Sequence, residues 1–199
     1  MFDSNTLLGI ANAALVGIGE RTIDALGDKQ DKLSMQADML LQQVILDIEG
    51  VACCPWKELL ETKKLVLAEA EQKLGSWYFN KPTDLLCAVE VISDNGVSRY
   101  DFKEEGRYLI VPASACSKNN AWIKYIRKSF DPGEWSSELR GCVIALLSAR
   151  MMGVVSSDGM KALNLEQAFW KGEYVRRMEN RILCTEAVEQ YPRGEYPGA

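Results

Sequence analysis

The chain has 199 residues, no histidine and a formal net charge of −5, with 47% hydrophobic and 26% charged residues. This composition is typical of a soluble globular protein, and the lack of histidine excludes Ser-His-Asp, Cys-His and HExxH catalytic schemes. The acidic balance argues against a general nucleic-acid binder. No apolar run in the sequence reaches the roughly 18 residues that a membrane helix needs.

The cysteines indicate buried thiols rather than disulfides or a metal site. Cys53 and Cys54 are adjacent, and the other cysteines stand singly among apolar neighbours. The sequence has no CxxC pair, and the chain is larger than the disulfide-dense scaffolds of secreted proteins. We therefore expect free thiols in a protein made in a reducing cytoplasm, with no metal and no other cofactor.

Two helices are expected near the N-terminus. Capping residues at positions 3–5 precede apolar residues at helical spacing, which predicts a helix over about 4–17. A longer stripe, with spacings of three and four residues, predicts a second helix over about 31–50. Its members are Leu33, Ala37, Leu40, Leu41, Val44, Ile45 and Ile48.

The middle of the chain changes to the two-residue period of β-strands. Apolar residues alternate from Leu85 to Val91, and Asn95-Gly96 is a pair that favours a tight turn. Further strand patterns flank a turn near residues 103–106, and the run at 121–130 also alternates. We therefore predict one small antiparallel sheet over about 83–130.

Two more helices are expected after the sheet, over about 136–152 and 160–187, followed by an extended tail at 188–199. Ser136 or Ser137 can cap the first of these helices. Each helix has one apolar stripe to bury, so the helices must pack together across the insertion. The predicted fold class is therefore α+β: one domain over 1–187, mainly a bundle of about four helices with a small inserted antiparallel β-sheet.

Five stretches of the sequence follow one another in an order found in a known family. They are IANAALVGIGERTIDALGD, ADMLLQQVILDIEGVACCPWKE, YFNKPTDLLCAVEV, RYDFKEEGRYLIV and IKYIRKSFDPGEWSSELRGCVIALLSARMM. They look like an opening helix with its turn, a second helix, a strand entry, a hairpin, and a strand joined to a helix through a Pro-x-x-Trp turn. In this order the chain resembles the tail tubular protein A, or head-to-tail adaptor (gatekeeper), family of T7-like short-tailed bacteriophages.

The resemblance implies a structural virion protein without catalytic activity. Members of this family form a ring, usually of about twelve subunits, between the portal protein and the tail nozzle. The ring connects head to tail and helps to retain or gate the packaged DNA. The implied partners are the portal, a nozzle protein similar to tail tubular protein B, and other copies of the chain. DNA only passes through the lumen, no membrane is involved, and the implied location is the head–tail junction of the virion.

Three groups of residues are candidates for contacts in such a particle. The charged face of the last helix is either solvated surface or a heterologous contact between ring subunits; its candidates are Glu173, Arg176, Arg177, Glu179 and Arg181. Hairpin tips are candidates for docking the nozzle, since binding sites often lie on loops of a rigid scaffold; these are Asp94, Asn95, Glu104 and Glu105. The C-terminal tail is a candidate for portal contact through Tyr191, Arg193 and Tyr196.

Tryptophans allow two interpretations. Trp56, Trp122 and Trp135 could anchor an interface, or they could fill a structural seam between helices and sheet, where a large ring with one N–H group is well suited. We favour the seam, above all for Trp135, which stands between a Pro-Gly turn and a helix.

Three other functions remain as alternatives to the adaptor. A head-completion connector of a long-tailed phage would share the helical plan. A soluble enzyme using carboxylate acid/base chemistry would draw on Glu104 and Glu105 or on Asp131 and Glu134, but adjacent glutamates at a turn are better explained as solvated residues. A DNA-binding regulator is disfavoured by the net charge of −5.

Overall fold

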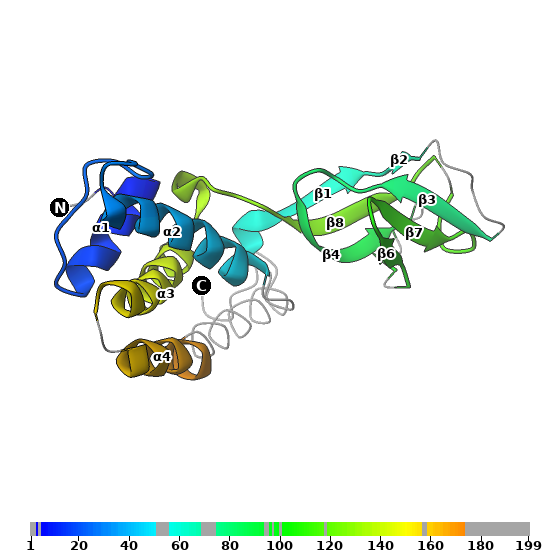
Figure 1. Ribbon diagram of the computed structural model, residues 1–199. Coiled ribbons are helices and arrows are strands. Elements are labelled where there is room, and N and C mark those ends of the chain that lie inside the picture. Colours follow the sequence, from blue (N-terminus) through cyan, green and yellow to red (C-terminus); the bar gives the residue numbers. More distant parts are fainter. Residues whose placement is uncertain are drawn as a thin grey trace, which may run out of the picture. The chain divides into compact units, whose positions relative to one another are not determined.

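The computed structural model describes residue 3 and residues 5–50, 56–68, 75–93, 96, 98–99, 101–117, 119–156 and 159–173. The chain divides into two compact units (Figure 1). Met1–Ile48 and Asp131–Ala199 form the helical unit, and Glu49–Phe130 forms the β unit. The β unit is therefore inserted in the sequence between the two halves of the helical unit.

The described residues of the helical unit include four α-helices. They are α1 (Leu7–Gly17), α2 (Lys32–Gly50, whose last two residues belong to the β unit), α3 (Ser137–Val155) and α4 (Gly159–Ala168), with a 3-10 turn, η2, at Pro132–Glu134. A π-helical turn, η3 (Phe169–Glu173), continues α4. The helix predicted over 160–187 is thus described only as far as Glu173, and the predicted tail at 188–199 lies outside the described residues.

Side-chain caps fix where two of these helices begin. The Thr6 hydroxyl accepts a hydrogen bond from the Gly9 N–H at 3.0 Å at the start of α1. The Ser136 hydroxyl accepts one from the Leu139 N–H at 3.2 Å at the start of α3. Each cap satisfies an N–H group that the first helical turn leaves without an intrahelical partner.

Asn12, buried in α1, fixes the connector that leads to α2. Its Nδ2 donates to the Ile23 carbonyl at 3.0 Å, and its Oδ1 accepts from the Ile23 N–H at 2.8 Å. Both backbone groups of a buried residue are satisfied by one side chain. α1 is also joined to α3, because the Ser148 hydroxyl donates to the Ala14 carbonyl at 3.2 Å.

Arg150 on α3 forms ion pairs with two other helices. Its Nη1 lies 2.6 Å from Asp47 of α2, and its Nη2 lies 2.8 Å from Glu166 of α4. Burial lowers the pKa of the guanidinium, but the hydrogen bonds to Glu166 and Asp47 outweigh it and keep the pKa above its ordinary value. Arg150 therefore holds α2, α3 and α4 together as a charged group.

The described part of the β unit contains eight strands in two four-stranded antiparallel sheets, with the orders β1-β8-β4-β5 and β2-β3-β7-β6. A 3-10 turn, η1 (Lys57–Leu59), precedes the first strand. The strands are β1 (Leu60–Lys64), β2 (Val66–Leu67), β3 (Ser76–Asn80), β4 (Leu85–Ile92), β5 (Ser98–Arg99), β6 (Lys103–Glu105), β7 (Tyr108–Pro112) and β8 (Trp122–Arg127).

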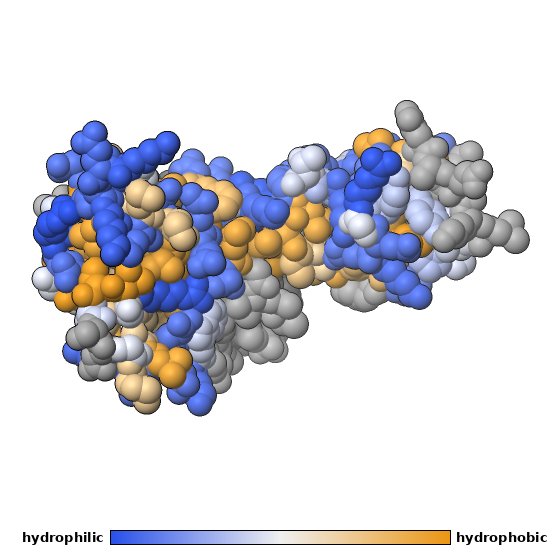
Figure 2. Space-filling view, viewed as in Figure 1, coloured by the Kyte–Doolittle hydropathy of each residue, from blue (hydrophilic) through white to orange (hydrophobic). Residues whose placement is uncertain are grey.

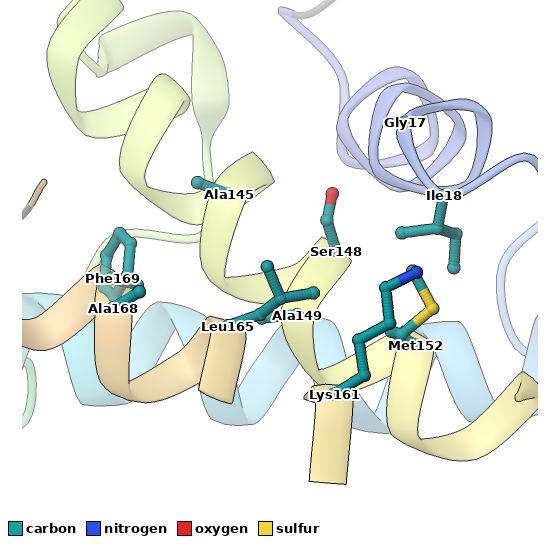
Figure 3. Close-up of a pocket in the computed structure, with 10 residues that line it drawn as sticks. All are labelled: Gly17, Ile18, Ala145, Ser148, Ala149, Met152, Lys161, Leu165, Ala168 and Phe169. Atoms are coloured by element: carbon teal, nitrogen blue, oxygen red, sulfur yellow. The ribbon is translucent and has the colours of Figure 1, made fainter. Parts of the chain in front are cut away.

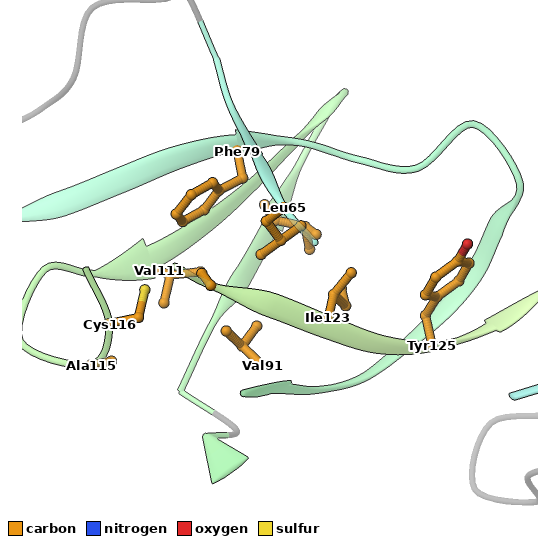
Figure 4. Close-up of a cluster of buried hydrophobic side chains, with 10 residues drawn as sticks. Leu65, Phe79, Val91, Val111, Ala115, Cys116, Ile123 and Tyr125 are labelled. Atoms are coloured by element: carbon orange, nitrogen blue, oxygen red, sulfur yellow. The ribbon is translucent and has the colours of Figure 1, made fainter. Parts of the chain in front are cut away.

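Both sheets contribute to one hydrophobic core (Figure 4). Its buried members include Phe79, Leu109 and Val111 from one sheet and Val91, Ile123 and Tyr125 from the other. The Tyr125 hydroxyl donates to the Asp84 carboxylate at 3.1 Å. Burial and this hydrogen bond raise the pKa of Tyr125 far above its ordinary value, so the hydroxyl keeps its proton as the donor.

The predicted fold class is wrong about the balance between helices and sheet. The chain is α+β, but it is not a helical bundle with one small sheet, because the β unit has two sheets and a core of its own. Strands β1, β2 and β3 precede residue 83, where the predicted sheet begins. β1 has the sequence LETKK and β2 has only two residues, so neither shows the apolar alternation on which the prediction relied.

Candidate functional site

Most of the residues predicted to make contacts lie outside the described part of the chain. These are Asp94, Asn95, Arg176, Arg177, Glu179, Arg181, Tyr191, Arg193 and Tyr196. Glu173 is the last described residue and ends η3.

Glu104 and Glu105 lie in strand β6 rather than at the tip of the hairpin. The turn follows at Gly106, which has the positive φ of 53° that a glycine adopts without strain. The Glu104 carboxylate lies 2.7 Å from the Lys81 ammonium group. β6 is an edge strand, and exposed charges on such an edge discourage pairing with strands of other chains. A partner that binds Glu104 would have to compete with Lys81.

The three tryptophans of the predicted seam differ in exposure. Trp56 is fully buried and Trp135 is 3% exposed, whereas Trp122 is 41% exposed. Trp122 lies on β8, where its register partners are Lys64 of β1 and Ile92 of β4. An indole at the surface beside an apolar neighbour is typical of residues that anchor protein contacts.

Helix α2 exposes three apolar side chains, and the polar Gln42 and Gln43 are exposed beside them. Met35, Met39 and Leu46 are spaced by four and seven residues, so they lie on one face of the helix. They are 43%, 68% and 37% exposed. We call these three side chains the α2 ridge. In the space-filling view, hydrophobic surface is visible on the helical unit between hydrophilic patches (Figure 2).

A cavity of about 590 Å³ lies in the same unit among α1, α3 and α4 (Figure 3). Its lining is mostly apolar; it consists of Gly17, Ile18, Ala145, Ser148, Ala149, Met152, Lys161, Leu165, Ala168 and Phe169. The lining residues that the structure describes include one charged side chain, Lys161. This volume falls in the range of about 300–1,000 Å³ that is usual for ligand pockets. We call this cavity the α4 groove.

Glu49 is a buried carboxyl that the sequence analysis missed. Its side chain is fully buried, and its Oε2 accepts a hydrogen bond from the Ser129 N–H at 3.3 Å. Its Oε1 accepts no hydrogen bond from the described residues. Burial raises the pKa of Glu49 to about 7, although the Ser129 hydrogen bond and the charge of Arg127 act to lower it. The sequence did contain a sign of this burial, because Glu49 stands four residues after Ile45 and therefore next to it on the buried face of α2.

Among the described residues, no group of three or more His, Cys, Asp or Glu side chains is placed to hold a metal ion. No helix in the described ranges is both long and apolar enough to cross a membrane. No protein-family model matches the chain, and no curated protein matches it.

Proposed function

We propose that this chain is the subunit of a ring-shaped head-to-tail adaptor in a short-tailed bacteriophage. In this role the ring stands between the portal and the tail nozzle, connects head to tail, and helps to retain or gate the packaged DNA. The protein acts through protein–protein contacts as a structural component of the virion. The proposal starts from the five ordered sequence stretches that resemble the adaptor family.

The observation that supports it best is that each unit completes a core and still exposes apolar side chains. In the helical unit these are the members of the α2 ridge and several residues of α4. In the β unit the largest is Trp122, which stands outside the core that both sheets form. An adaptor has to bind neighbouring subunits and two different partners at once, which requires more than one contact surface on each chain.

The test is a mass measurement of the purified chain with and without purified portal rings. We expect a complex whose added mass corresponds to a ring of about twelve chains on each portal. An acidic protein of similar mass, mixed with the same portal rings, is the control for nonspecific association. If the measured mass of the chain is the same with and without portal rings, even when both are concentrated, the proposal is wrong.

Binding of the nozzle protein separates this proposal from a connector of a long-tailed phage. The assembled portal–adaptor complex is expected to bind the nozzle protein encoded by the same phage, while portal rings alone are not. A complex that forms with portal but binds a long-tail completion protein in place of the nozzle would assign the chain to the other class.

A further inference from the structure

Glu49 and Ser129 stand at the two ends of the β unit. The unit begins at Glu49 and ends at Phe130, so Ser129 is its last residue but one. The Glu49 Oε2 accepts a hydrogen bond from the Ser129 N–H at 3.3 Å, which joins positions 80 residues apart in the sequence. We call this bond the Glu49 clasp. It ties together the two places at which the chain enters and leaves the β unit.

The clasp depends on a carboxyl in apolar surroundings. Glu49 is 0% exposed, and so are Val44, Ile45 and Ile48 on the same helix. Its Oε1 accepts no hydrogen bond from the described residues, and a buried polar atom without a partner is costly, above all when it is charged. Glu49 also stands in the last turn of α2, where the carbonyl groups at the helix end disfavour a negative charge. These surroundings suit the protonated acid better than the carboxylate.

The charges near Glu49 do not reverse this preference. Among the described residues, the charge that acts on Glu49 comes from Arg127 of β8. The Arg127 Nε also lies 3.8 Å from a carboxylate oxygen of Glu61 in β1, so part of its charge is balanced elsewhere. Burial raises the pKa of Glu49 to about 7, against the Ser129 hydrogen bond and the charge of Arg127, which both act to lower it.

We propose that the Glu49 clasp holds the two ends of the β unit together and opens when the carboxyl loses its proton to water. An opened form that lets water reach Glu49 removes the cost of burying the carboxylate, so ionisation favours that form. Opening loosens both connections between the β unit and the helical unit in one step, because each connection begins next to a member of the clasp. The inference does not depend on the adaptor function.

The two pKa values set how strongly pH acts on the clasp. In the closed form the pKa is about 7, and in an opened form it returns to the ordinary 4.5. The ratio of open to closed molecules then increases about tenfold from pH 6 to pH 8. The chain has no histidine, the side chain that ordinarily titrates in this range, so few other groups interfere.

Amide hydrogen exchange at Ser129 in the full chain measures the opening. After correction for the intrinsic pH dependence of exchange, we expect the wild-type rate to be about tenfold higher at pH 8 than at pH 6. Glu49→Gln keeps an acceptor oxygen but cannot ionise, so its corrected rate is expected to be equal at both pH values. Glu105→Gln is the matched control; it removes an exposed carboxyl of β6 and should keep the tenfold change.

Urea distinguishes opening of the clasp from unfolding of the entire β unit. Opening the clasp exposes little surface, so exchange at Ser129 is expected to be insensitive to low urea concentrations at pH 8. Leu65 is the reference, because its N–H donates to the Ala121 carbonyl at 2.8 Å in the same unit. Its exchange is expected to be slower than that of Ser129 and to speed up with urea. Equal corrected rates with equal urea dependence at the two amides would overturn the proposal, since Glu49 would then be exposed only by unfolding.

Two further results would also overturn it. One is a corrected Ser129 rate that does not change with pH in the wild type, and the other is a change of equal size in Glu49→Gln. If Glu49→Gln does not fold, titration of the Glu49 carboxyl by carbon-13 NMR in the wild type takes its place. A midpoint near 7 supports the clasp, and a midpoint near 4.5 overturns it.

Discussion

Replacing Glu49 by glutamine is expected to remove a pH dependence from the stability of the protein. Glu49 is fully buried, and burial raises its pKa from an ordinary value of 4.5 to about 7. The folded state therefore binds the proton of this carboxyl more tightly than the unfolded state does. For this group alone, stability is highest below about pH 4.5, falls as the pH rises toward about 7, and is constant above that value.

The size of the effect follows from the two pKa values. A difference between 4.5 and about 7, at about 1.4 kcal/mol per pH unit, amounts to about 3 kcal/mol in the free energy of unfolding. Glutamine has nearly the same shape, cannot ionise, and can still accept the hydrogen bond from the Ser129 N–H. Glu49→Gln is therefore expected to match the wild type near pH 4.5 and to exceed it by up to about 3 kcal/mol near pH 8.

The assay is urea unfolding of both proteins at several pH values between about 4.5 and 8. Taking the difference between the two proteins at each pH cancels the titration of all the carboxyls that they share. Glu105→Gln is the control, because it removes an exposed carboxyl of β6 by the same chemical change. The stability of this control is expected to follow the wild-type pH profile.

A difference that stays constant with pH would refute the reasoning. It would mean that Glu49 ionises in the folded state as easily as in the unfolded state, and hence that water reaches its carboxylate. A variant whose loss of stability grows as the pH rises would instead show that the ionised Glu49 carboxylate makes a favourable contact that outweighs the cost of its burial.

Three other substitutions test contacts that lie within one unit or the other. Arg150→Met is expected to lower the free energy of unfolding by about 1–3 kcal/mol, since two carboxylates lose a partly buried partner; thermal unfolding measures it. Tyr125→Phe should cost about 1 kcal/mol, because the hydroxyl loses its hydrogen bond to Asp84, and urea unfolding of the β unit detects it. Asn12→Ala should cost about 2–4 kcal/mol, because both backbone groups of buried Ile23 lose their partner, and amide exchange at Ile23 should speed up. An unchanged exchange rate at Ile23 would contradict the last of these.

The helices were the part of the fold that the sequence could reveal. Apolar residues at spacings of three and four indicate a helix over 31–50, and α2 runs over Lys32–Gly50. Ser136 is one of two candidate caps, and its hydroxyl does accept the Leu139 N–H at the start of α3. Both signals are local: a helix makes its hydrogen bonds within itself, so its period and its caps are visible in a short window.

The first three strands were not predicted, and for β1 and β2 the stabilising contacts come from strands elsewhere in the chain. β1 pairs with β8, about 60 residues later, and most of its residues are exposed and polar. β3, with the sequence SWYFN, pairs with β7 and lies before the predicted start of the sheet. β1 and β2 are short edge strands, which take their structure from the strand beside them rather than from their own side chains. β3 is different, because it lies between β2 and β7 and its aromatic residues favour a strand.

Sequence patterns also did not distinguish the residues that are buried from those that stay exposed for a contact. Trp56, Trp122 and Trp135 are the same residue type, and only the structure separates the exposed Trp122 from the two buried rings. The predicted stripe of α2 left out Met35, Met39 and Leu46, which form the exposed ridge. Periodicity reveals how much apolar surface a helix has, but not whether its own core or another molecule covers it. For α2 its own core accounts for one side of the helix, and Met35, Met39 and Leu46 stay exposed on another side that no periodicity argument could assign.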